Sequence, residues 1–248
     1  MFKTHNKQFQ LNLPTSLGSK LLKLSYIFIA LFLSSCGDAK LDKANEESQS
    51  VQEIEETNAE ETATKTILCF GDSITAGYGL DDSNEAYPAI LQQKIDSLNL
   101  DYTVINSGVS GETTAGGKSR IDWVIKQNVD IFLLELGAND GLRGVQLSET
   151  HSNLQSIIDV VKEKSPKTTI ILAGMELPPN MGQEYTTGFR QLYADLAKTN
   201  NLEFIPFILK DVGGVTSLNQ SDGIHPTIKG HKIVANTVWE TLKPLLIP

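Results

Sequence analysis

The sequence predicts an α/β fold, a three-layer α/β/α sandwich around a five-stranded, mainly parallel sheet. Two observations favour this class. Five short runs are apolar and β-branched almost throughout, as expected of strands that are covered on both faces. These runs alternate with amphipathic stretches of helical length, and parallel neighbouring strands need such crossover connections.

The elements follow one another in a regular order. Strands are expected at residues 66–70, 102–105, 130–136, 169–173 and 203–207, and helices at 87–98, 114–127, 148–164, 187–200 and after Thr227. Four of the strands lead directly into a glycine, namely Gly71, Gly108, Gly137 and Gly174. In open α/β sheets the ligand crevice lies outside the carboxyl ends of the strands. The residues after these glycines are therefore expected to meet at one edge of the sheet.

Residues 1–35 are predicted to be an export signal and not part of the fold. They carry four lysines and no acidic residue, and they contain an apolar run at 24–33 that is too short for a transmembrane helix. The end of this run, Leu33-Ser34-Ser35-Cys36, resembles the bacterial lipobox. That resemblance implies that Cys36 is lipidated and that the protein is anchored in the bacterial cell envelope, facing the periplasm or on the outer membrane.

Residues 36–65 are predicted to be an acidic, disordered tether. From residue 37 onward the segment holds nine Asp or Glu against three Lys and has no aromatic residue, so it buries too little apolar surface to fold. A flexible coil of this length has a root-mean-square span of roughly 30 Å. The tether is therefore long enough to hold an enzyme clear of a membrane surface.

Residues 66–248 have the length of one domain with a sizeable core. The net charge of −9 and the lack of a basic cluster argue against a nucleic-acid partner. No ligand spacing for a metal is visible, and neither a metal nor a cofactor is expected. Once Cys36 is lipidated, Cys69 is the remaining thiol and no intramolecular disulfide forms. A monomer is expected.

Two segments supply the groups of a nucleophilic site. Gly71-Asp72-Ser73 has the composition of an ordinary turn. Because it follows the first strand directly, it places Ser73 at the sheet edge where the ligand crevice is expected. Asp222 and His225 lie three residues apart in a loop that Gly223 and Pro226 keep from becoming helical. A carboxylate on one imidazole nitrogen leaves the other free to take a proton from a serine. Structural or solvent roles are expected for His151 and His231.

Such a site also needs hydrogen-bond donors aimed at the oxyanion. Gly111, after the second strand, offers a backbone N–H without a side chain in the way, and Asn139, after the third, offers a side-chain amide. The backbone N–H of Ser73 makes a third donor.

These four blocks, Gly71-Asp72-Ser73, Gly111, Gly137-Ala138-Asn139-Asp140 and Asp222-Gly223-Ile224-His225-Pro226, resemble those of the SGNH, or GDSL, hydrolases. Residues 77–79, 138–144 and 177–182 resemble the branch of periplasmic acyl-CoA thioesterases, arylesterases and lysophospholipases. Ala138, where relatives often have a second Gly, and the tether depart from that branch.

The resemblance implies a flavodoxin-like fold and a serine esterase or thioesterase that works through an acyl-enzyme. Ser73 would be the nucleophile, His225 the general base and acid, and Asp222 its orienting carboxylate. Ser73, Gly111 and Asn139 would form the oxyanion hole. The apolar loops 141–146 and 177–181 favour an acyl ester over a sugar, and the expected substrate contacts are Asp72, Leu142, Val145, Leu177, Pro178 and Met181.

Alternatives remain at this point. A carbohydrate O-deacetylase has the same fold, and a lipid-binding lipoprotein could use the same groove without turnover. Residues 111–119 approach a nucleotide-binding P-loop, but Glu112 stands where its first glycine belongs. Ser110 is a second candidate nucleophile, although no G-x-S-x-G elbow surrounds it.

Overall fold

A computed structural model describes residues 64–125 and 128–247. The predicted export signal, the predicted lipidation site Cys36 and nearly all of the predicted tether lie outside these residues. Five strands form one sheet in the order β2-β1-β3-β4-β5, and every neighbouring pair is parallel. They are β1 (Lys65–Gly71), β2 (Tyr102–Gly108), β3 (Ile131–Glu135), β4 (Thr169–Ala173) and β5 (Glu203–Ile205). This is the flavodoxin-like order, whose switch point lies between β1 and β3.

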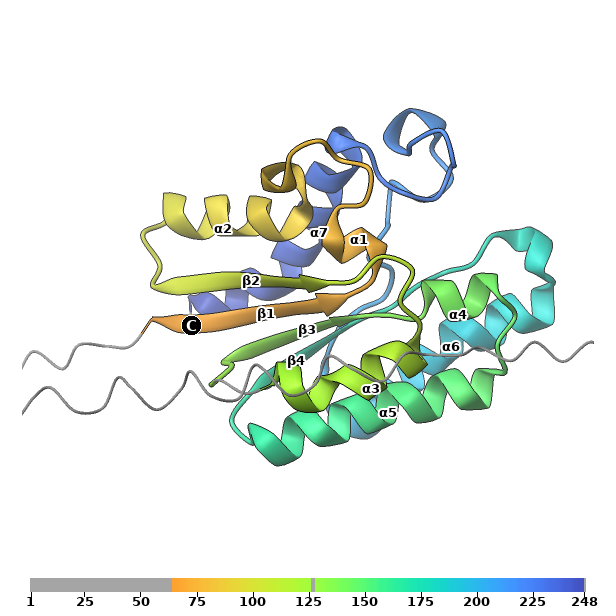
Figure 1. Cartoon of the computed structure of the whole chain (residues 1–248), viewed down its shortest axis with the longest axis horizontal. Coiled ribbons are helices and arrows are strands. Elements are labelled where there is room, and N and C mark those ends of the chain that lie inside the picture. Colours follow the sequence, from red (N-terminus) through yellow and green to blue (C-terminus); the bar gives the residue numbers. More distant parts are fainter. Residues whose placement is uncertain (1–63, 126–127, 248) are drawn as a thin grey trace, which may run out of the picture. The chain divides into compact units, whose positions relative to one another are not determined.

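Helices cover both faces of the sheet, which confirms the predicted three layers (Figure 1). One face carries α2 (Tyr87–Ser97) and α7 (Ile228–Leu246), which contact each other. The other carries α3 (Thr114–Val124), α5 (Leu147–Lys164) and α6 (Gln183–Asn200), with α5 contacting both of its neighbours. Three short 3₁₀ turns, η1 (Ser83–Glu85), η2 (Pro179–Met181) and η3 (Thr216–Leu218), lie in the connections.

The core lies between the central strands and the helices. All five residues of β3 are buried, as are five of the seven in β1. The edge strand β2 differs, and the prediction that every strand is covered on both faces is wrong there. Tyr102 and Val104 pack on the core, whereas Ile105 is 37% exposed. β2 is the outermost strand and has a neighbouring strand on one side only. The residues of a strand do not show which position it takes in the sheet.

Several element ends differ from the prediction for local reasons. Strand β5 stops at Ile205 because Pro206 has no N–H to donate to a ladder. Helix α3 ends at Val124, short of the predicted 127, and residues 126–127 lie outside the described part. Helix α6 begins at Gln183, four residues earlier than predicted, directly after Gly182, whose φ is +90°.

Two short helices at the carboxyl ends of the central strands were not predicted, namely α1 (Ser73–Ala76) and α4 (Ala138–Leu142). The Asp72 side chain caps α1 by accepting the Ile74 N–H, and Gly77 in the left-handed region ends it after one turn. Each is one turn long and therefore too brief to show a helical period in the sequence. Both begin where a strand ends, so they carry Ser73 and Asn139 to the predicted crevice.

Candidate active site

The turn after β1 presents Ser73 and permits no side chain at Gly71. A Cβ on Gly71 would lie 2.1 Å from Thr75 Oγ1 and 2.6 Å from the Glu135 carbonyl oxygen. Glycine is required here because β1 and β3 approach each other closely as α1 begins. Ser73 is 8% exposed, so its hydroxyl lies in a largely desolvated position at the start of α1.

The loop before α7 forms a tight turn around Asp222. Asp222 Oδ1 accepts the N–H groups of Ile224 at 3.0 Å and His225 at 3.1 Å, and Gly223 adopts a φ of +78°. This turn directs Asp222 Oδ2 to His225 Nδ1 at 2.7 Å. The spacing of three residues therefore produces the side-chain contact that the sequence suggested.

The ring of His225 also reaches the turn that contains Ser73, here called the nucleophile turn after the predicted role of Ser73. His225 Nε2 lies 2.9 Å from Ser73 Oγ, although 152 positions separate the two residues in the chain. With the Asp222 carboxylate on Nδ1, the proton of a neutral ring belongs on Nδ1, which leaves Nε2 to accept the serine hydroxyl hydrogen. The arrangement can therefore transfer a proton from Ser73 to His225.

Hydrogen bonds keep Asp222 ionised. Partial burial raises the pKa of its carboxyl, but the bonds from the His225 ring and from the Ile224 and His225 N–H groups outweigh this and lower the pKa to about 2. Asp222 is therefore a carboxylate throughout the neutral range and stabilises an imidazolium on its neighbour.

Two residues whose contacts the sequence analysis did not predict, Gln220 and Tyr78, connect the loop of Asp222 and His225 to the nucleophile turn. Gln220 Nε2 donates to the Tyr78 carbonyl at 2.6 Å, and its backbone N–H donates to the His225 carbonyl at 2.7 Å. The Tyr78 ring lies against the His225 ring, with centroids 4.7 Å apart. Because no spacing rule relates residues 78 and 220, the sequence carries no signal for this bridge.

The predicted oxyanion donors lie in neighbouring loops. Gly111 is exposed, has a φ of +79°, and has no atom within 4 Å of the point that a Cβ would take, so the space on that side of its backbone is open. Asn139 Nδ2 donates to the Glu112 carbonyl at 3.0 Å and to Asp72 Oδ2 at 3.2 Å. An oxyanion would compete for one of these amide hydrogens, and the longer bond to Asp72 is the easier to give up.

The predicted role of Asp72 as a substrate contact is wrong. Its side chain is fully buried and is used by the Ile74 N–H and the Asn139 amide, so no surface remains for a substrate. Burial raises the pKa of Asp72 to about 6, partly offset by the Ile74 N–H. Asp72 is a positioning residue that links the nucleophile turn to Asn139.

A second buried carboxyl supports the same turn from β3. Glu135 Oε2 accepts the Thr75 hydroxyl at 2.7 Å and the Asp72 N–H at 3.3 Å. Burial, and then the negative charge of Asp72, raise the pKa of Glu135 well above its ordinary value. The sequence places it at the end of an apolar strand but gives no indication of this contact.

The remaining predicted side chains lie on two adjoining loops. Gly141 of α4 packs on Leu177, whose methyl group lies 2.4 Å from where a Cβ would be. Leu142 is 39% exposed, Val145, Leu177 and Met181 are half-buried, and Pro178 is exposed.

Two further histidines of the described residues, His151 and His231, lie outside this constellation. His231 is buried in α7, where its Nδ1 accepts the Tyr87 N–H at 3.3 Å, and His151 is exposed on α5. Within residues 64–125 and 128–247, no three His, Cys, Asp or Glu side chains gather as a metal ion would need. No helix in that part of the chain is both long and apolar enough to span a bilayer.

Comparison with known proteins places this geometry in a family. The model of the GDSL-like lipase/acylhydrolase family matches residues 69–233, which include all three residues of the Ser73, His225 and Asp222 arrangement. The chain belongs to this family. It is a carboxylic ester hydrolase with the SGNH hydrolase fold.

Three relatives illustrate the similarity. Esterase TesA of Pseudomonas aeruginosa is 38% identical over 188 residues, 75% of this chain and 92% of that protein. Thioesterase 1/protease 1/lysophospholipase L1 of Escherichia coli K12 is 35% identical over 74% of this chain and 86% of its own length. A crystal structure of TesA superimposes with a TM-score of 0.70 at 37% identity, covering 73% of this chain and all of that one.

Truncation of the Asn139 amide tests its predicted role as an oxyanion donor. Asn139→Ala is expected to lower kcat by about 10²- to 10³-fold with little change in KM, because an oxyanion donor acts on the transition state. Steady-state kinetics on a p-nitrophenyl ester measure both constants. A loss confined to KM would show that Asn139 binds the ground state instead.

Proposed function

We propose that the protein hydrolyses acyl esters and acyl thioesters through an acyl-enzyme, with Ser73 as the nucleophile. The observation that carries this proposal is the pair of contacts at His225, 2.9 Å to Ser73 Oγ and 2.7 Å to Asp222 Oδ2. His225 Nε2 takes the hydroxyl proton as Ser73 Oγ attacks the acyl carbonyl carbon. The carbonyl oxygen becomes an oxyanion held by the N–H groups of Ser73 and Gly111 and by the Asn139 amide.

The second half of the reaction reverses these proton transfers. The His225 imidazolium, stabilised by Asp222, gives its proton to the departing alcohol or thiol as the tetrahedral adduct collapses to the acyl-enzyme. Water then attacks the same carbonyl carbon while His225 accepts its proton. Collapse of this second adduct releases the carboxylic acid and returns the proton to Ser73.

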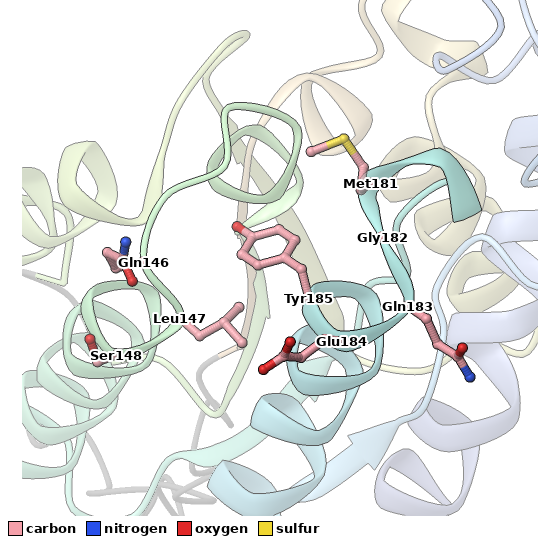
Figure 2. Close-up of a pocket in the computed structure, with 8 residues that line it drawn as sticks. All are labelled: Gln146, Leu147, Ser148, Met181, Gly182, Gln183, Glu184 and Tyr185. Carbon is pink, nitrogen blue, oxygen red and sulfur yellow. The ribbon is translucent and has the colours of Figure 1, made fainter.

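The acyl chain is proposed to lie along Leu142, Val145, Leu177, Pro178 and Met181. Two contacts support the pairing of their loops: Gly141 packs against Leu177, and Tyr185 Oη donates to the Val145 carbonyl at 2.6 Å. Beyond Val145, residues 146–148 and 181–185 line an open pocket of about 500 Å³. Figure 2 shows Leu147 on one side of this pocket and Met181 on the other, with the Tyr185 ring between them. The similarity to a lysophospholipase and thioesterase also supports an acyl substrate.

A panel of p-nitrophenyl esters from two to ten carbons tests the acyl assignment. Each methylene that leaves water contributes about 0.8 kcal/mol, so kcat/KM is expected to rise by up to roughly fourfold per carbon until the site is filled. Met181→Asp is expected to lower the long-chain rates and to leave the acetate rate unchanged. A maximum at acetate that declines with every carbon would instead indicate a deacetylase, and a silent wild type would indicate a binding protein.

The protein is further proposed to be a lipoprotein of the bacterial cell envelope, acylated at Cys36. The position of Leu33-Ser34-Ser35-Cys36 at the end of an apolar run supports this, as does the acidic segment that follows. In cells fed an alkyne-tagged fatty acid, the wild type and Cys69→Ala are expected to become labelled and Cys36→Ser is not. Label that persists in Cys36→Ser would refute the anchor.

A further inference from the structure

A buried ion pair lies directly behind the Gly111 loop. Arg120 extends from α3 and meets Glu112 with two parallel bonds, Nε to Oε1 at 2.6 Å and Nη2 to Oε2 at 2.5 Å. The two side chains are 9% and 6% exposed, and the guanidinium carbon lies 3.8 Å from the centroid of the Phe70 ring. This fork geometry fixes direction as well as distance.

The same guanidinium joins the ends of two strands. Arg120 Nη1 donates to Ser107 Oγ and Nη2 donates to the Ser107 carbonyl, both at 2.9 Å, at the end of β2. Nη2 also lies 3.4 Å from the Gly71 carbonyl at the end of β1, two residues before Ser73. One side chain therefore ties the nucleophile strand, the neighbouring strand and the Glu112 loop together.

Glu112 passes this restraint to both donors that lie outside the nucleophile turn. Its backbone follows directly on Gly111, and its carbonyl accepts the Asn139 amide at 3.0 Å. A displacement of Glu112 therefore shifts the Gly111 N–H and the Asn139 Nδ2 together. The loop has other ties: Arg143 Nη2 donates to the Gly111 carbonyl at 3.1 Å, the Glu112 N–H donates to the Val109 carbonyl at 3.1 Å, and Asp140 accepts the Thr114 N–H at 2.8 Å. Arg143 is exposed, whereas Arg120 holds Glu112 from the buried side.

We infer that Arg120 and Glu112 are positioning residues for the oxyanion hole, holding the Gly111 N–H and the Asn139 amide in register with Ser73. The inference rests on the proposed function. A buried ion pair is weak evidence of a stabilising role, because its replacement by apolar residues of similar volume is often neutral or stabilising. What an apolar pair lacks is the directional bonding that reaches Ser107, Gly71 and Glu112 at once.

A double variant, Arg120→Met with Glu112→Leu, separates positioning from folding. It removes both charges and so leaves no unpaired ion in the interior. We expect the melting temperature to stay within a few degrees of the wild type and KM to change by less than about twofold. We expect kcat to fall by roughly 10- to 100-fold, which is less than the loss caused by removing an oxyanion donor altogether. The inhibition constant of an alkylboronic acid, whose tetrahedral adduct places an oxygen in the hole, is expected to rise by the same factor.

The matched control is Lys164→Gln with Asp122→Asn, which removes an exposed ion pair of 2.7 Å between α5 and α3 and is expected to keep wild-type constants. A double variant of Arg120 and Glu112 with wild-type kcat and boronate affinity overturns the inference. If that variant does not fold, Arg120→Lys is measured instead. Lysine keeps the charge but not the parallel bonds, so an unchanged kcat there overturns the inference too.

The outcome also distinguishes this inference from the proposed function. Ser73→Ala is assayed in the same series. Full activity in Ser73→Ala would remove the proposed function, whereas an inactive Ser73→Ala beside a fully active Arg120→Met/Glu112→Leu would remove the positioning role alone.

Discussion

Ser73→Ala is expected to lower kcat for p-nitrophenyl esters by about 10⁶-fold, because it removes the atom that forms the acyl-enzyme. The fold should not change. Ser73 is the first residue of α1, where alanine is well tolerated, and the hydroxyl's hydrogen bond is to His225. Equal melting curves and circular dichroism spectra for the two proteins check that point.

Ser110→Ala is the matched control for this result. Ser110 lies exposed in the loop after β2, and its removal is expected to leave kcat within tenfold of the wild type. A fluorophosphonate probe gives an independent readout, since it should label the wild type and Ser110→Ala but not Ser73→Ala. Hydrolysis that survives in Ser73→Ala and disappears in Ser110→Ala would reassign the nucleophile.

Asp222→Asn is expected to lower kcat by about 10⁴-fold while KM changes little. An asparagine amide donates to Nδ1, so the ring proton moves to Nε2 and the histidine no longer accepts from Ser73. Neither does the amide stabilise an imidazolium. Asp101→Asn, an exposed substitution of the same kind, should behave as the wild type. A kcat for Asp222→Asn within tenfold of the wild type would contradict this role.

The lowered pKa of Asp222 adds a pH test. Its stabilising contribution is fully present above the unfolded-state pKa of 3.8 and is lost as the pH falls through about 2. The Asp222 carboxylate therefore does not titrate between pH 5 and 9. We expect the pH–rate profile of the wild type to contain no limb in this range that comes from Asp222, so Asp222→Asn should remove no limb from the profile. Profiles of kcat/KM for both proteins over this range measure it.

The sequence predicts the parts of this site that depend on strand ends and on short spacings. Ser73, Gly111 and Asn139 follow strands that share one sheet edge, and Asp222 and His225 lie in one turn. Parallel topology then brings them together without further information. The alternation of apolar runs and amphipathic stretches likewise predicts all five strands and the five long helices close to their observed bounds.

The sequence does not predict contacts between distant residues that share no spacing. Gln220 with Tyr78, Glu135 with Thr75 and Arg120 with Gly71 become neighbours through the fold alone. The same limit explains Asp72, which reads as an exposed turn residue but is buried once α4 covers it with Asn139. The exposed face of β2 follows from its place in the sheet, which its own residues do not encode.

The nucleophile and its base come from opposite ends of the folded region, 152 positions apart. A nascent chain that has emerged as far as α6 already contains Ser73, yet it still lacks His225, whose ring lies against that hydroxyl in the complete fold. The proposed site is therefore complete only once the loop before α7 is present, so a chain truncated before that loop is expected to be inactive.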